Sequence, residues 1–468
     1  MAIMLKLTVA RGQADGPPIS EAELRSLAAL PAAEAWQALR RHALRLRQLE
    51  PDPLPYLSAL RILFDAAAAL PSRAAAGEEA RRWWLWLHEE CARLAAADGG
   101  LPARRDGRWL ASALALASGW RLAGLCALRY APLPAGFWQG CHRVFADARA
   151  QRWYTRLPAE GLASAGVSYR KLLLLGISGG NRLQTARLQL LLAWLEGHGG
   201  RLALQALPSG RREACWRVEL NADLPARFAE PETAAGAGWL LDAEPVLRAL
   251  RAAMEGGAQT ATAAEWQLLA RLEGEWSQPP QRRHLRLNQR NGQRVQLLAG
   301  FERCWQMAHD GAPSPQTPPA ELLVLNLSAA GIRLGGELAG LALQAGEPVM
   351  LKRRGFGWQL GLVRWISLPD DPLPGECGVE FVGKRPLAVE AAAVTSLDDG
   401  TMAPGLLLQA ERRFLRRGVL LLPGRAYQPL RPFRLRAADG EWLVRAQRLL
   451  QQTGACQLME VSLDERVE

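Results

Sequence analysis

The residue types best suited to holding a ligand gather in one short segment, Arg282-Arg283-His284-Leu285-Arg286. The planar guanidinium group of arginine presents a fork of donors that matches a phosphate and also the O6/N7 edge of guanine. Its face can stack on a base. Pro279 and Pro280 come just before this segment and disfavour a helix there. We therefore expect an extended arm that binds a ligand bearing both phosphates and guanines and that stays mobile until such a ligand orders it.

A second polar cluster follows the apolar run from Leu322 to Leu325 and consists of Asn326, Ser328 and Gly331. The run predicts a strand. Because side chains two apart lie on the same face of a strand, we expect Asn326 and Ser328 to share a face. The amide oxygen of Asn326 can accept a hydrogen bond from a guanine N–H, and Ser328 can reach a base or a phosphate. We expect Gly331 to take a positive φ where the chain turns.

These marks occur in a fixed order: an arginine arm of the form RxxxR, a strand ending in (D/N)xSxxG, and a later strand ending in Gly378-Val379-Glu380-Phe381. In this order they resemble the PilZ domain, a small antiparallel β-barrel that binds the bacterial second messenger cyclic di-GMP. The resemblance covers about residues 279–385, where we expect strands and turns. It implies that six residues bind the messenger: Arg282, Arg283, Arg286, Asn326, Ser328 and Gly331.

The composition is that of a folded protein with several domains. The 468 residues suffice for about two to four domains. The formal net charge is +11, but the arginines are spread along the whole chain, so the charge by itself does not indicate nucleic acid. Seven cysteines are scattered without a CxxC pair, and neither a secretory signal nor an uninterrupted apolar stretch of membrane length is evident. These features predict a cytoplasmic protein with reduced thiols.

Changes of pattern divide the chain into four parts and predict a multidomain α+β protein. Residues 1–155 predict an all-helical module, and residues 156–278 a mixed α/β module and linker. Residues 279–385 form the PilZ-like antiparallel β-barrel of the resemblance, and residues 386–468 predict a small C-terminal β domain. Helices are expected at Glu34–Leu49, Pro55–Leu70, Gly77–Ala97, Gln184–Gly197, Glu244–Met254 and Ala263–Trp276, and C-terminal strands at Gly405–Leu408, Gly418–Leu422, Phe433–Arg436, Trp442–Arg448 and Cys456–Leu463.

One predicted helix contains three tryptophans, Trp83, Trp84 and Trp86. Trp83 and Trp86 are three residues apart and can share a face, whereas Trp84 points elsewhere. We interpret the group as two tryptophans that pack in the core and one at its edge. The alternative is an aromatic patch that binds a protein partner.

Two short patterns match fragments of catalytic motifs. Gly176-Ile177-Ser178-Gly179-Gly180 fits the GxSxG pattern of a nucleophile elbow, but no oxyanion loop and no regular alternation of parallel strands and helices accompany it. The same segment lacks the Gly-Lys-Ser/Thr ending of a phosphate-binding loop. His88-Glu89-Glu90 begins like HExxH, but Ala92 stands where the second metal ligand belongs. We therefore predict a connecting turn at Ser178, no metal site and no enzymatic activity.

The sequence thus predicts a non-catalytic receptor whose ligand is cyclic di-GMP. Binding would order the arginine arm, change the arrangement of the domains and signal to a protein partner through the helical N-terminal half. Two alternatives stay open: a structural adaptor that works without the ligand, and a basic nucleic-acid-binding protein. Binding of the messenger would exclude the first, and steep salt dependence of binding to generic nucleic acid would favour the second. The pathway, the oligomeric state and the choice between one messenger and an intercalated pair are not specified.

Overall fold

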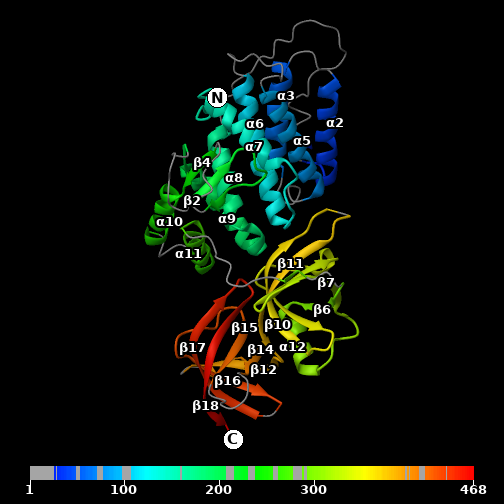
Figure 1. Ribbon diagram of the computed structural model, residues 1–468, viewed down its shortest axis with the longest axis vertical. Coiled ribbons are helices and arrows are strands. Elements are labelled where there is room, and N and C mark those ends of the chain that lie inside the picture. The colour runs from blue at the N-terminus through cyan, green and yellow to red at the C-terminus, as the bar shows by residue number, and fades with distance from the viewer. Residues whose placement is uncertain are drawn as a thin grey trace. The chain divides into compact units, whose positions relative to one another are not determined.

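Helices predominate before residue 280, and two β-barrels follow, as Figure 1 shows in blue to green and in yellow to red. The predicted multidomain α+β class is therefore confirmed. The computed structural model describes residues 26–27, 29–48, 53–70, 77–96, 107–158, 161–206, 215–229, 238–256, 262–277, 287–288, 292–370, 372–395, 398–399, 401–409, 417–438 and 440–467. Contacts between Cα atoms divide the chain into two compact units, residues 1–122 with 139–169 and residues 123–138 with 170–468.

The first unit is built from antiparallel helices whose apolar positions recur every three to four residues. Where the sequence predicts helices in this unit, the structure has helices with slightly different ends. One further helix is almost completely buried, in keeping with its alanine- and leucine-rich sequence on all sides. The helices are α2 (Ala32–Gln48), α3 (Pro53–Ala68), α5 (Glu78–Ala95), α6 (Gly107–Leu128) and α7 (Phe137–Ala150).

The tryptophans of α5 pack as two core residues and one at the edge, as expected, but the buried pair is Trp83 and Trp84 and not the two residues that share a face by spacing, Trp83 and Trp86. Trp83 and Trp84 are buried, whereas Trp86 is partly exposed. Trp36 of α2 contacts both buried rings, with centroid separations of 6.4 and 6.5 Å. The aromatic cluster thus joins α2 to α5 in the core of the first unit.

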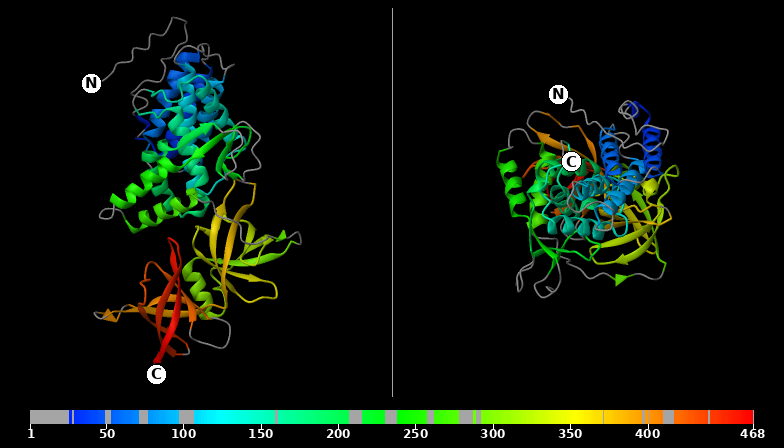
Figure 2. Two further views of the ribbon diagram at one scale, coloured as in Figure 1. Left: turned by 60° about the vertical axis from the view of Figure 1, so that its left-hand side comes forward. Right: turned by 90° about the horizontal axis from the view of Figure 1, so that it is seen from above.

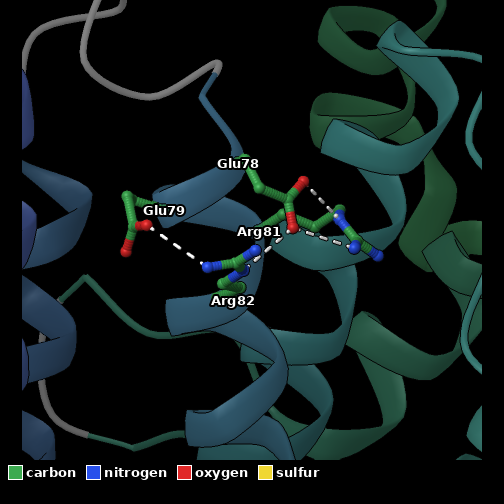
Figure 3. A network of polar contacts seen from close by, with 4 residues as sticks. All are labelled: Glu78, Glu79, Arg81 and Arg82. Atoms are coloured by element: carbon green, nitrogen blue, oxygen red, sulfur yellow. Dashed lines mark hydrogen bonds and ion pairs between the residues drawn. The ribbon is translucent and has the colours of Figure 1, made fainter. Parts of the chain in front are cut away.

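The partly buried beginning of α5 carries a network of opposite charges, shown in Figure 3. The guanidinium group of Arg81 donates to both carboxylate oxygens of Glu78 at 3.0 Å, and Arg82 reaches Glu78 at 3.2 Å and Glu79 at 3.5 Å. Spacings of three and four residues place these side chains on one face of the helix. Glutamates in the first turn also interact favourably with the helix dipole, so the network stabilises the start of α5.

Helix α6 is the one described helix whose length and composition would allow it to cross a membrane. Its mean hydropathy is 1.4, and 78% of the apolar window is buried inside the structure. Because the core helices of many proteins have the same properties, α6 is weak evidence for a membrane span.

The second unit contains a mixed α/β part that precedes the barrels. The run Tyr169–Leu175, which could form a helix or a strand, belongs to helix α8. A four-stranded antiparallel sheet has the order β1-β4-β2-β3. The strand-like runs Arg201–Ala206 and Cys215–Leu220 of the sequence predict β1 and β2, whereas β3 and β4 were not predicted. The elements are α8 (Ala165–Ile177), α9 (Thr185–His198), β1 (Ala203–Ala206), β2 (Cys215–Glu219), β3 (Arg227–Ala229), β4 (Gly238–Asp242), α10 (Glu244–Gly256) and α11 (Ala263–Ser277).

The first barrel is a closed six-stranded antiparallel sheet in the order β7-β6-β9-β10-β11-β8, closed by pairing of β8 with β7. A short strand, β5, adds to the edge of β7. The expectation of strands and turns alone was wrong, because Phe301–Asp310 forms helix α12 between β6 and β7. The strands are β5 (Leu287–Asn288), β6 (Arg294–Ala299), β7 (Ala320–Leu327), β8 (Gly331–Gly336), β9 (Pro348–Arg353), β10 (Gln359–Ser367) and β11 (Gly375–Lys384).

The second barrel repeats the strand order of the first. If the six strands of each barrel are numbered along the chain, both barrels close in the cyclic order 1-2-3-6-5-4. All five C-terminal strands predicted from the sequence are present, and β12 is an additional one. The strands are β12 (Leu387–Thr395), β14 (Ala403–Gln409), β15 (Arg417–Pro423), β16 (Pro432–Ala437), β17 (Gly440–Gln452) and β18 (Cys456–Val467), with β13 (Asp398–Asp399) pairing at the end of β12.

Helix α12 joins the cores of the two barrels. Cys304 and Met307 of α12 are buried in one apolar cluster with Met350 of the first barrel and with Leu406 and Leu458 of the second. The indole N–H of Trp305, also in α12, donates to the carbonyl oxygen of Val389 in β12 at 3.0 Å. Figures 1 and 2 show α12 beside the strands of the second barrel. The two barrels therefore share a hydrophobic core.

Candidate functional site

Strand β5 connects the arginine arm to the motif that follows β7. Leu287 pairs with Leu327, and Asn288 pairs with Asn326. Arg282, Arg283 and Arg286 lie outside the residues that the structure describes, but Leu287 is the residue immediately after Arg286. The chain that leaves the arm is therefore hydrogen-bonded to the end of β7 that carries Asn326. Two segments about forty residues apart in sequence thus meet in the folded chain.

Ser328 holds the turn between β7 and β8 together. Its backbone N–H donates to the carbonyl oxygen of Gly331 at 2.8 Å, and its hydroxyl donates to the same oxygen at 3.2 Å. The N–H of Gly331 lies 3.1 Å from the Ser328 hydroxyl oxygen, which can accept its hydrogen bond. Because the Ser328 hydroxyl is within hydrogen-bond distance of both the N–H and the carbonyl oxygen of Gly331, it fixes the geometry of the turn. Ala329, inside the turn, is exposed.

Gly331 is required for a reason other than the one expected from the sequence. Its φ is not among the positive values found in the described residues, so the prediction of a positive φ was wrong. Instead, a Cβ atom at this position would lie 2.4 Å from the carbonyl oxygen of Val379 in β11. The N–H of Phe381 donates to the carbonyl oxygen of Ala330 at 2.8 Å. The Gly378–Phe381 segment therefore lies directly against the turn, and only glycine allows this close approach.

Four residues are aligned across neighbouring strands next to this turn. Asn326 of β7 is opposite Arg333 of β8, Arg333 is opposite Gly378 of β11, and Gly378 is opposite Trp365 of β10. A Cβ atom on Gly378 would come within 2.0 Å of the indole nitrogen of Trp365, so the indole lies on the bare backbone of Gly378. The guanidinium carbon of Arg333 is 5.8 Å from the centre of the Trp365 ring. We call Asn326, Arg333, Gly378 and Trp365 the cross-strand row.

Carboxylates flank the cross-strand row and hold two arginines in place, Arg333 of the row and Arg364 beside it. The Nε of Arg333 donates to Glu376 at 3.1 Å, and Arg333 is 39% exposed in its side chain. In the same way, Arg364 forms an ion pair with Glu380. A planar indole, a partly exposed guanidinium group and an amide in one row can together stack on a base, bind a phosphate and accept from a base N–H.

The sequence reasoning did not identify Arg333 and Trp365 as candidate ligand residues. Arg333 follows Gly331 by two residues, and this alternation could have indicated an outward position beside the motif. Trp365 has no such local signal, because its place depends on the pairing of β10 with β11 and on a register shift between Val363 and Trp365. Only the folded sheet brings it beside Gly378.

The segment around Ser178 has none of the features of a nucleophile elbow. Ser178 is fully buried, its hydroxyl donates to the carbonyl oxygen of Leu174 at 2.6 Å, and it accepts from the indole N–H of Trp276 at 3.2 Å. It follows the C-terminus of α8 rather than a strand, and Gly179 takes a φ of 57°. The hydroxyl therefore caps a carbonyl group at the end of α8 and holds Trp276 of α11 by a hydrogen bond.

His88 has a structural position in the first unit. It is buried in α5, and its Nδ1 lies 2.8 Å from the carbonyl oxygen of Ala115 in α6, to which the N–H tautomer donates. Burial lowers the pKa of this imidazole, and the hydrogen bond to Ala115 opposes that effect. Within the described ranges, no group of three His, Cys, Asp or Glu residues could hold a metal ion.

A comparison with protein families provides an independent indication of function. Residues 20–209 match the family model described as "Cyclic-di-GMP receptor FimW, N-terminal domain". No curated protein sequence matches the chain. The matched range ends before the first barrel, whose strands begin at Leu287. The match therefore supports a cyclic di-GMP receptor. The matched part of the chain contains none of the six predicted ligand residues, so it is independent of them.

Proposed function

We propose that the chain is a non-catalytic cyclic di-GMP receptor that binds the messenger on the outer face of the first barrel. The observation that carries the proposal is the pairing of Leu287 with Leu327, which attaches the end of the arginine arm to the strand bearing Asn326. The match of residues 20–209 to the N-terminal domain of a cyclic di-GMP receptor supports the same ligand from the helical part.

In this proposal the arginine arm and the turn after β7 contact different parts of the messenger. Arg282, Arg283 and Arg286 bind the phosphates and the O6/N7 edges of the guanines. Asn326 accepts from a guanine N–H, while Ser328 and Gly331 keep the turn in the shape that the ligand needs.

The cross-strand row extends the site along the barrel. Trp365 offers a planar face on which a guanine can stack, and Arg333 lies beside it with its guanidinium group held by Glu376. The ion pair keeps the guanidinium plane oriented in the free protein, which lowers the entropic cost of binding.

Binding would then act on the rest of the molecule through the arm. The messenger draws the arginines onto the barrel, and this selects one arrangement of the domains that the arm connects. The shift cannot exceed the preference of the ligand for that arrangement. We propose that the helical N-terminal half reports the change to a protein partner.

The test is calorimetric titration of the full-length protein with cyclic di-GMP, with GTP as the control nucleotide. A micromolar dissociation constant corresponds to about −8 kcal/mol, and loss of one arginine contact costs about 1–3 kcal/mol. We expect saturable binding of the cyclic dinucleotide alone and about tenfold weaker binding by Arg286→Ala. The stoichiometry would distinguish one bound messenger from an intercalated pair.

Two further variants separate the site from a general effect of charge. Trp365→Ala is expected to weaken binding by an amount similar to that of Arg286→Ala, because it removes a stacking face worth about 1–3 kcal/mol. Arg303→Ala removes an exposed arginine on α12, outside the site, and should bind the messenger like the wild type. Absence of binding to the wild type would reject the receptor, whereas equal effects of Arg286→Ala and Arg303→Ala would reject the site.

A further inference from the structure

A second concavity of about 970 Å³ lies on the first barrel where β6, β7 and β9 meet. Its polar lining includes Arg294 of β6, Glu321 of β7, Lys352 and Arg353 of β9, and Arg354 in the turn that follows. Pairing of Val295 with Arg353 and of Gln296 with Lys352 places this end of β9 beside β6, where Arg294 and the cations of β9 border the same concavity. The volume is in the range of sites that enclose a nucleotide-sized ligand.

The concavity has an excess of positive charge. Four cationic side chains line it against one carboxylate, Glu321, which is 3.4 Å from Arg294. Both partners of this ion pair are more than half exposed, so it is weak. Lys352, Arg353 and Arg354 form no ion pair with any carboxylate in the described part of the chain. Three cations are therefore available to an anionic ligand.

Aromatic rings lie beside these cations on the hairpin between β9 and β10. The guanidinium carbon of Arg353 is 4.5 Å from the centre of the Phe356 ring, and Phe356 is 58% exposed. The ammonium group of Lys352 is 5.7 Å from the centre of the Trp358 ring. Gly355, which lies between Arg353 and Phe356 in the chain, takes a φ of 79°, and a Cβ atom there would meet open space. Trp358 packs against the shared core, so Phe356 is the exposed ring of this hairpin. Cations beside an exposed ring suit a ligand that has both phosphates and planar bases.

This concavity is separate from the proposed messenger site. Glu321 lies near the start of β7, about 16 Å along the strand from Asn326, whereas Gln293 at the other end of the lining accepts from the N–H of Val324, two residues before Asn326. The concavity therefore adjoins the proposed messenger site without including its residues. None of the residues of the cross-strand row lines the concavity. The two places can therefore bind different ligands.

We propose that the concavity binds a single strand of nucleic acid through its phosphates, with bases stacking on the hairpin. Scattered arginines do not predict such binding, but four cations line this one hollow, and the exposed ring of Phe356 lies beside Arg353 at its edge. Because these cations line a concave surface, the geometry suits a strand of nucleic acid better than the surface of a membrane. RNA and DNA have the same phosphodiester backbone, so the experiment tests a strand of each.

The experiment measures fluorescence anisotropy of labelled oligothymidylate and oligouridylate with the full-length protein over a series of salt concentrations. Each neutralised phosphate of a single strand contributes a slope of about −0.7 to log K against log [salt], so contacts from the three available cations give about −2.1. In Lys352→Gln/Arg354→Gln the slope should become shallower by about 1.4, with about tenfold weaker binding at low salt. Equal affinity for the two strands would indicate backbone recognition, and a preference would name the nucleic acid; either result supports the proposal.

A charge-matched control removes one lysine and one arginine elsewhere on the same barrel. Lys384→Gln/Arg303→Gln changes two exposed cations that do not line the concavity, and it should bind the strands like the wild type. Circular dichroism checks that both double variants are folded.

Several outcomes would overturn the proposal. These are no binding of either strand at low salt, equal weakening by the two double variants, and displacement of the strand by pyrophosphate alone at equal concentration, which would indicate a simple phosphate site. Loss of cyclic di-GMP binding by Lys352→Gln/Arg354→Gln would assign the concavity to the messenger site instead. If Lys352→Gln/Arg354→Gln still binds cyclic di-GMP, a negative result with nucleic acid rejects the nucleic-acid site alone and leaves the receptor proposal standing.

Discussion

At the scale of single residues, the roles of Ser328 and Gly331 are set by their contacts with the backbone. Ser328 closes the turn through hydrogen bonds with Gly331, and Gly331 allows β11 to approach. The sequence places both residues correctly in a motif, but the local pattern suggests a positive φ for Gly331 that the structure does not have. The constraint arises from Val379, forty-eight residues further along the chain, and therefore has no local signal.

Gly331→Ala is expected to lower the free energy of unfolding by about 1–3 kcal/mol, because the added Cβ atom overlaps the carbonyl oxygen of Val379. Displacement of the turn should weaken messenger binding as well. Denaturant titration and calorimetry measure the two effects. Gly340→Ala is the control, since a Cβ atom there has open space around it. Equal stability of Gly331→Ala and Gly340→Ala would show that the turn can move at no cost.

At the scale of elements, periodicity in the sequence predicts helices well and strands less completely. The helices α2, α3, α5, α9, α10 and α11 appear where apolar residues recur at helical spacing. Strand β12 was missed because its sequence, Leu387 to Thr395, is rich in alanine, a residue that favours helices. Pairing with both β14 and β16 overrides that propensity.

The packing of α5 against α6 makes the first unit sensitive to acid. Burial keeps the pKa of His88 below its ordinary value of 6.5, whereas in the unfolded chain the imidazole binds a proton as the pH falls through 6.5. The unfolded state therefore binds more protons, and the free energy of unfolding should fall below pH 6.5 by up to about 1.4 kcal/mol per pH unit from this group.

Chemical denaturation between pH 5 and pH 8, followed by helical circular dichroism, measures this effect. His88→Gln keeps an N–H donor for Ala115 and does not titrate, so its stability should depend less on pH over the acid part of the range. The two proteins should have the same pH slope above pH 7. An unchanged acid slope in His88→Gln would contradict the assignment.

At the scale of the whole molecule, the two barrels share both a strand order and a core. Lys384 ends β11 and Leu387 begins β12, so a very short connection joins them. Helix α12 places Met307 in the shared cluster beside strands of both barrels. A ligand on the first barrel therefore acts on a body that includes the second.

Met307→Ala is expected to destabilise both barrels, because it opens a cavity in the shared core at a cost of about 2–5 kcal/mol. Hydrogen exchange should show lower protection in β10 of the first barrel and in β15 of the second. Val324→Ala, which truncates a buried residue of the first barrel outside the shared cluster, should lower protection mainly in the first barrel. If Met307→Ala affects β10 alone, the barrels are independent folding units.

The sequence by itself determined the α+β class, the positions of most helices and C-terminal strands, and the order of an arginine arm, an Asn-Ser-Gly motif and a late strand. These features are local, since each depends on residue types within about a dozen positions. The tertiary structure alone decided what depends on strand register and on distant contacts. It placed Trp365 on Gly378, formed α12 between β6 and β7, and gave both barrels one strand order. Such features follow from pairing between residues far apart in sequence, which a local pattern does not encode.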